Sequence, residues 1–252
     1  MNENKYSAKE ILSTATTIGF NLLKYGAEVY RVEETISRIC LAYGYKDSHV
    51  FAIGSNITAS VMDGDFTRTE TRRIKSRELN LDKIDKLNDL SRRVCNETPD
   101  LETVREYIKE IEDRPVYPLP IIVLCDAVIS FCFTLFFGGF IKEAGIAFLA
   151  GSIARVCSSF VAKISNHQYS KIAISSFIIA MIAYLFQNNL PGIDGDVIVI
   201  GSIMTLVPGI SVTNALRDFF AGDTITGLAT FAESILVAVS IAIGVAVAMV
   251  LG

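Results

Sequence analysis

The stretch LPIIVLCDAVISFCFTLFF, residues 119–137, contains a single charged side chain, Asp126. About 20 consecutive apolar residues are enough for a helix to cross the hydrocarbon core of a bilayer. The apolar residues are continuous rather than alternating, and a helix satisfies its backbone hydrogen bonds internally. The stretch therefore predicts a transmembrane helix.

Four further apolar runs follow this stretch in the second half of the chain. One carries a single arginine, Arg155, another carries a single glutamate, Glu233, and a third is uncharged but contains Pro208-Gly209. Five such runs in succession favour a membrane domain over a bundle of buried helices in a soluble protein. The four runs are Ala144–Ala162, Ile172–Phe186, Val197–Val212 and Ile225–Leu251.

Charge divides the chain into two parts, since residues 1–117 carry 38 of the 50 charged side chains. Ser7 and Glu10 have the spacing of a capping box, and the helical periodicity that follows ends at Gly26. A second helix is predicted from Ala27, followed by a hairpin and two more helices near 81–96 and 101–113. We therefore predict an α+β domain over residues 1–114 and a domain of five transmembrane helices over 115–252.

The loops between the apolar runs predict the orientation, because basic residues of short loops stay in the cytoplasm. Lys163 and Lys171 follow the second run and Arg217 follows the fourth, whereas NNLPGIDGD, residues 188–196, holds two aspartates and no basic residue. The N-terminal domain is therefore expected in the cytoplasm and the C-terminus outside. The start, MNENKYSAKE, lacks the apolar core of a cleavable signal peptide.

Several classes of function receive no support from the composition. The net charge of −4 gives no nucleic-acid footprint, and no glycine loop for binding phosphate is present. The five cysteines lack a CxxC spacing, and His49 and His167 lack the spacing of metal ligands. We expect no metal, no cofactor and no catalytic constellation, so transport is favoured over catalysis. A membrane-anchored cytoplasmic enzyme and a partner-recruiting scaffold stay open as alternatives.

Charged residues inside the apolar runs are the first candidates for a site, since they are costly there and usually line a pathway or pair with each other. Asp126 lies roughly 12 Å into its run at 1.5 Å per residue. Arg155 suits a substrate carboxylate, and Asp126 or Glu233 suits proton coupling. A structural Asp126–Arg155 pair and a hydrogen bond from Glu233 to a neighbouring helix are the alternatives.

Pro208-Gly209 is a second candidate, because proline removes a backbone donor and crowds the preceding turn. Transporters use such breaks so that the ends of half-helices face the substrate or ion. A helix that merely ends early is the alternative. The residues expected to line the break or its mouth are Ser211, Thr213, Asn214, Arg217, Asp218 and Asp223.

Three segments resemble the threonine/serine exporter family of bacterial membrane transporters: YGAEVYRVEETISRI (25–39), SNITASV (55–61) and LVPGISVTNALRDFFAGDTITG (206–227). The resemblance covers nearly the whole chain and implies gradient-driven or proton-coupled export of amino acids or dicarboxylates such as succinate across the inner membrane. Long members of the family carry a second membrane half, so the resemblance implies a short type that works with a small membrane subunit. A homo-oligomer is a further possibility.

The resemblance also gives the motif of the N-terminal domain a role in docking or gating. Without the resemblance, these charges would be interpreted as a solvated helix face with ion pairs. The residues concerned are Gly26, Glu28, Arg31 and Glu33.

Overall fold

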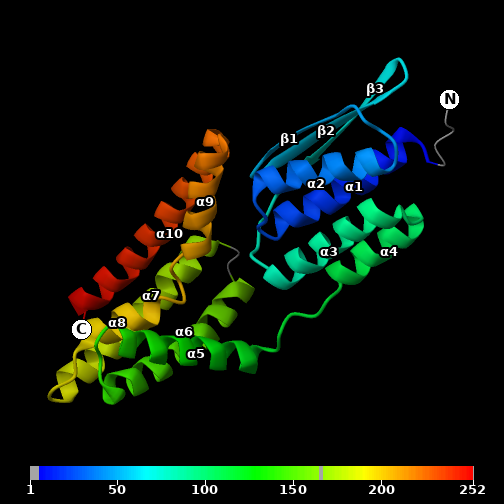
Figure 1. Ribbon diagram of the computed structural model, residues 1–252. Coiled ribbons are helices and arrows are strands. Elements are labelled where there is room, and N and C mark those ends of the chain that lie inside the picture. The colour runs from blue at the N-terminus through cyan, green and yellow to red at the C-terminus, as the bar shows by residue number, and fades with distance from the viewer. Residues whose placement is uncertain (1–5, 165–166, 252) are drawn as a thin grey trace. The chain divides into compact units, whose positions relative to one another are not determined.

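The computed structural model describes residues 6–164 and 167–251 and divides into two compact units (Figure 1). The first unit contains the described residues up to Pro115 together with Thr213–Thr230. The second contains Val116–Val212 and the described residues from Phe231 onward. No local sequence pattern predicts that residues 213–230 pack with the first unit.

Two helices open the first unit, α1 (Ala8–Lys24) and α2 (Val29–Ala42). The predicted capping box is present, since the Ser7 backbone N–H donates to Glu10 and the Glu10 N–H donates to the Ser7 hydroxyl. Gly26 follows α1 with a φ of 94°, a left-handed conformation that glycine adopts without strain. The sharp turn at this glycine leads directly into the charged motif at the start of α2.

A three-stranded antiparallel sheet follows in the order β1 (Ser48–Ile53), β2 (Asn56–Asp63) and β3 (Phe66–Arg73). The alternation in β2 buries Ile57, Ala59 and Val61 on the face that packs against α1 and α2. The hairpin of β2 and β3 confirms the prediction, whereas β1 was not predicted.

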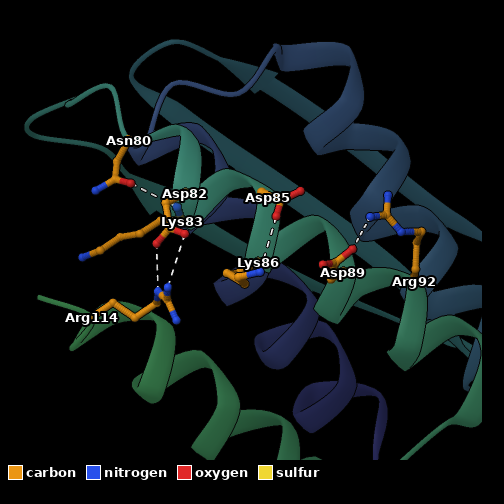
Figure 2. Close-up of polar contacts among 8 residues, drawn as sticks. All are labelled: Asn80, Asp82, Lys83, Asp85, Lys86, Asp89, Arg92 and Arg114. Carbon is orange, nitrogen blue, oxygen red and sulfur yellow. Dashed lines mark hydrogen bonds and ion pairs between the residues drawn. The ribbon is translucent and has the colours of Figure 1, made fainter. Parts of the chain in front are cut away.

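Helices α3 (Leu81–Glu97) and α4 (Leu101–Glu112) complete the N-terminal part of the first unit, close to the predicted bounds. Asn80 caps α3, and Arg114 binds the Asp82 carboxylate with two nitrogens, 2.8 and 3.3 Å away (Figure 2). Lys83 is buried, and its ammonium donates to the Glu112 carbonyl at 2.8 Å. These contacts hold the end of α4 against the start of α3.

The second unit consists of apolar helices: α5 (Leu119–Phe136), α6 (Ile141–Ile164), α7 (Gln168–Asn189), α8 (Gly195–Ile203) and most of α10 (Thr224–Leu251). Among the described residues, α5, α6, α7 and α10 are long and apolar enough to cross a membrane. Four of the five predicted runs therefore correspond to helices of spanning length.

The remaining run, Val197–Val212, is not one helix. α8 ends at Ile203, and α9 (Gly209–Ala221) begins after five intervening residues, the last of which is Pro208. Proline has no N–H to donate and crowds the preceding turn, which accounts for a helix boundary at this place. The helix break predicted at Pro208-Gly209 is present, and a fifth continuous span is not confirmed.

Small residues bring the helices of the second unit close together. A Cβ atom on Gly201 of α8 would lie 2.6 Å from the Thr134 backbone on α5, and one on Gly151 of α6 would lie 2.3 Å from the Ser130 hydroxyl. Glycine is required where backbones approach this closely, as in other membrane helix pairs. The tight contacts fix α6 and α8 against α5, the helix that carries Asp126.

Candidate functional site

Two of the three segments that carry the family resemblance, 25–39 and 206–227, are in contact within the first unit. The Arg217 guanidinium of α9 donates a hydrogen bond to the Glu28 carboxylate, which immediately precedes α2. Glu28 is only 8% exposed, whereas Arg217 is 60% exposed. The hydrogen bond and charge of Glu28 raise the pKa of Arg217, so the guanidinium stays charged. A buried carboxylate is thus held by an arginine that reaches solvent.

Neighbouring residues strengthen the same contact. The Asn214 side-chain amide donates to the Gly26 carbonyl at 3.4 Å, and Arg31 lies 3.7 Å from the second Glu28 oxygen. The Gly26 carbonyl is available because the chain has just left α1 through the left-handed turn. We call the set Gly26, Glu28, Arg31, Glu33, Arg77, Asn214, Arg217, Asp218 and Asp223 the motif cluster.

Asp218 is the most deeply buried carboxylate of the motif cluster, with 3% of its surface exposed. Its Oδ1 has no hydrogen-bond partner among the described residues. Burial, followed by the negative charge of Asp223, raises the pKa of Asp218 to about 6. Arg77 acts in the opposite direction, and Glu28 adds a further upward contribution. Asp218 is therefore the group of the motif cluster with the strongest tendency to bind a proton.

Glu33 lies on α2, five residues after Glu28. Its carboxylate accepts a hydrogen bond from the Ala52 backbone N–H at 2.7 Å, which ties α2 to β1. Burial raises the pKa of Glu33, the Ala52 N–H lowers it, and Asp223 raises it. Glu33 therefore links α2 to β1, and its pKa also depends on the negative charge of Asp223.

A second charged pair lies in the second unit. The Arg155 Nε of α6 is 3.3 Å from the Asp126 Oδ2 of α5, and the side chains are 39% and 20% exposed. Asp126 is seven residues from the start of α5, and Arg155 is seven residues before Ala162, so both lie about 10 Å inside their spans at 1.5 Å per residue. The pair that was predicted as one alternative is formed, and it remains accessible from one side.

The other predicted residues are placed apart from these two groups. Pro208, Gly209 and Ser211 lie at the break and in the first turn of α9, which is not among the helices of spanning length. Glu233 is exposed on α10, and no described side chain forms an ion pair or hydrogen bond with it. Thr213 stands at the point where α9 enters the first unit.

Sequence reasoning placed the N-terminal motif and the residues after the break in separate roles. The structure instead brings Glu28 to Arg217 and Gly26 to Asn214. Arg77, in the segment between β3 and α3, was missed altogether, because nothing in its local pattern distinguishes it from the neighbouring charges. The one available signal was that Glu28 and Arg217 both lie in segments of family resemblance, 25–39 and 206–227.

Within the described ranges, 6–164 and 167–251, no group of three or more histidine, cysteine or acidic side chains is placed to hold a metal ion. The second unit contains one arginine, Arg155, beside the carboxylate of Asp126 among apolar helices. The first unit contains one buried carboxyl group, that of Asp218, among charged residues. Such groups bind carboxylates, amines and protons.

The apolar helices with an embedded ion pair define the class as a membrane protein with several spans, of the kind that moves polar solutes. The family model described as putative threonine/serine exporter matches residues 13–252. The chain therefore belongs to this exporter family.

Similar proteins are known from three bacteria. The chain is 28% identical over 254 residues to the probable succinate transporter subunit YjjP of Klebsiella aerogenes, covering 99% of this chain and 96% of that protein. It is 27% identical to the Escherichia coli strain K12 protein of the same name, covering 92% and 90%. The threonine/serine exporter of Corynebacterium glutamicum is 24% identical, with coverage of 93% of this chain and 50% of that protein. No solved structure matches the chain.

Proposed function

We propose that the chain is one subunit of a secondary transporter that exports small carboxylates across the inner membrane of a bacterium, with succinate as the leading substrate. The Asp126–Arg155 pair is the observation that carries this proposal. An arginine binds a carboxylate through two parallel hydrogen bonds, and its charge remains in every state of a transport cycle.

The exposure of Arg155 supports a pathway rather than a purely structural pair. A guanidinium inside a span cannot face lipid tails without a large cost, so its exposed part must face water or another protein chain. We infer that a second membrane subunit covers this face and that the solute passes between it and Arg155.

The lengths of the relatives support the subunit assignment. The chain corresponds to nearly the full length of two proteins that are named as subunits, and to about half of the Corynebacterium glutamicum exporter. The word subunit in the names of the two relatives that are covered over nearly their full length supports a partner chain for this protein. The same comparison favours succinate over threonine and serine.

The Thr213–Thr230 segment supports five membrane crossings. Because this segment packs with the N-terminal motif, we infer that it lies on the side of the membrane from which α5 starts. Three crossings by α5, α6 and α7 would bring the chain to the opposite side of the membrane. A fourth crossing, by α8 and the residues before Thr213, would then bring it back, and α10 would make the fifth. Non-helical backbone is tolerated at membrane depth only where it is enclosed by protein or lines a polar cavity. We therefore propose that residues 204–208 line the solute pathway, with the N-terminal domain in the cytoplasm and the C-terminus outside.

Threonine and serine are the second candidate substrates, and one observation favours them. Asp126 lies 3.3 Å from Arg155, so the pair offers an acceptor for an ammonium group beside a donor for a carboxylate. A dicarboxylate would use Arg155 together with a cation from the second subunit.

Proteoliposome efflux separates these substrates. The chain is purified from its native membrane with the membrane proteins that remain bound to it, and vesicles are loaded with labelled succinate, threonine or serine. We expect succinate efflux above that of protein-free vesicles, and only background efflux for the chain alone. Efflux of threonine or serine but not succinate would reassign the substrate, and background efflux for all three solutes would overturn the proposal.

A further inference from the structure

The side chain of Asp218 is buried, and one of its two carboxylate oxygens lacks a hydrogen-bond partner among the described residues. It is 3% exposed, and its Oδ1 receives no hydrogen bond from any described residue. Leaving a charged carboxylate in this state costs far more than leaving a neutral carboxyl group there. The environment of this one side chain therefore demands either a bound cation or a proton.

The charges around Asp218 come from three parts of the first unit. Asp223 lies in the turn before α10, Glu28 lies at the start of α2, and Arg77 lies in the segment between β3 and α3. Arg217 and Arg31 both interact with the Glu28 carboxylate, so these two arginines are already paired and do not pair with Asp218. Arg77 is the one cation that acts on Asp218, and it forms no ion pair with it within the described chain.

A metal ion does not fit this place. The carboxylates of the motif cluster are not gathered closely enough to chelate one, since no three acidic, histidine or cysteine side chains of the described residues converge. A single proton on Asp218 removes the unfavourable charge without requiring further ligands. The surroundings of Asp218 therefore favour a proton over a metal ion.

We propose that Asp218 is a proton-binding site that controls the docking of α9 on the N-terminal motif. In its protonated form the side chain remains buried beside Glu28 and Asp223. When it loses the proton, repulsion by these two carboxylates and the cost of burying the charge favour release of α9. Release would break the Asn214–Gly26 and Arg217–Glu28 hydrogen bonds, so proton occupancy and docking are linked.

The linkage provides a route for coupling, and this step rests on the proposed function. α9 follows the break at residues 204–208 directly, so movement of α9 changes the backbone that we place in the solute pathway. The raised pKa of Asp218, to about 6, puts its titration in a range that a proton gradient can sample. Neither Asp126 nor Glu233 is required for this coupling.

Infrared difference spectroscopy of the intact protein, titrated in lipid nanodiscs with no substrate, tests proton binding directly. The wild-type protein is expected to show a protonated carboxyl band with a midpoint near pH 6, and Asp218→Asn is expected to lose it. Asp223→Asn should move the midpoint to lower pH because it removes a negative neighbour, and asparagine caps α10 as well as aspartate does. Asp65→Asn, in the exposed turn between β2 and β3, is the matched control and should leave the band unchanged.

The outcomes separate this inference from the proposed function. Retention of the band in Asp218→Asn, or an unchanged midpoint in Asp223→Asn, would overturn the assignment even if transport is observed. The assigned band without efflux of any solute would instead overturn the transport proposal and leave the proton site standing. If Asp218→Asn fails to fold, the midpoint shift in Asp223→Asn decides alone.

Discussion

Glu28 and Arg217 lie 189 positions apart in the sequence, yet their side chains share a hydrogen bond. The contact joins the motif at the start of α2 to α9, the helix that follows the break at residues 204–208. The two distant segments each supply four residues of the motif cluster, and Arg77 supplies the ninth.

The Glu28–Arg217 contact predicts a measurable coupling. Arg217→Gln should lower the melting temperature of the purified protein by about 2–4 °C, because it leaves the buried Glu28 with only the longer contact to Arg31. In a Glu28→Gln background the same substitution should have little effect. Arg31→Gln is the control, and an equal loss from Arg31→Gln and Arg217→Gln would contradict the assignment.

Exchange of Asp126 and Arg155 separates a structural pair from a solute site. Asp126→Arg combined with Arg155→Asp should recover most of the stability lost in either single variant, because the ion pair can form in the reversed order. Efflux should nevertheless stay at background, since the substrate meets a carboxylate where it needs a guanidinium. Thermal unfolding and succinate efflux are measured on the same preparations. Restored efflux in the exchanged protein would show that the pair is only structural.

Asp218 predicts a specific dependence of stability on pH. Its pKa in the folded protein is about 6, above the ordinary value of 3.8, so the folded state binds the proton more tightly. The favourable contribution is therefore complete below pH 3.8 and is lost as the pH rises through about 6. Asp218→Asn should flatten this slope and raise stability at pH 8 by at most about 3 kcal/mol.

Denaturation curves between pH 4 and 8 measure this effect. Asp65→Asn, which changes an exposed carboxylate, should keep the wild-type slope. A parallel slope in wild-type protein and Asp218→Asn would assign the pH dependence to other groups.

The tight contact between α8 and α5 predicts intolerance of a single methyl group. Gly201→Ala should destabilise the protein by about 1–3 kcal/mol, because the new Cβ would lie 2.6 Å from backbone atoms of Thr134. Gly145→Ala is the matched control within α6, since a Cβ there meets nothing within 4 Å. It should be neutral or slightly stabilising, as alanine is the better helix former. Equal stability of the two variants would contradict the close approach of the helices.

The helices could largely be predicted from the sequence, because their signals are local. The capping box at Ser7, the left-handed Gly26 and the continuous apolar runs each specify an element without reference to the rest of the chain. β1 was missed because its alternation is weak, with only Ala52 fully buried. Local signals therefore identified the helices well and the sheet only in part.

The sites could be predicted as residue types but not as partners. Charges within apolar runs identified Asp126 and Arg155, and helix pairing places them together. The contact of Glu28 with Arg217 depends on how a segment after the fourth run returns to the N-terminal unit, and no local pattern encodes such a return. The orphaned oxygen of Asp218 is likewise a property of packing, which only the structure reveals.

Succinate efflux from proteoliposomes that contain Arg155→Ala tests the central claim most directly. The protein is purified with the membrane proteins that remain bound to it, and Lys142→Ala, which removes an exposed basic residue from the same helix, is the control. We predict that Arg155→Ala reduces efflux to the background of protein-free vesicles while Lys142→Ala retains the wild-type rate. A wild-type rate in Arg155→Ala would contradict the role of this arginine in carboxylate export.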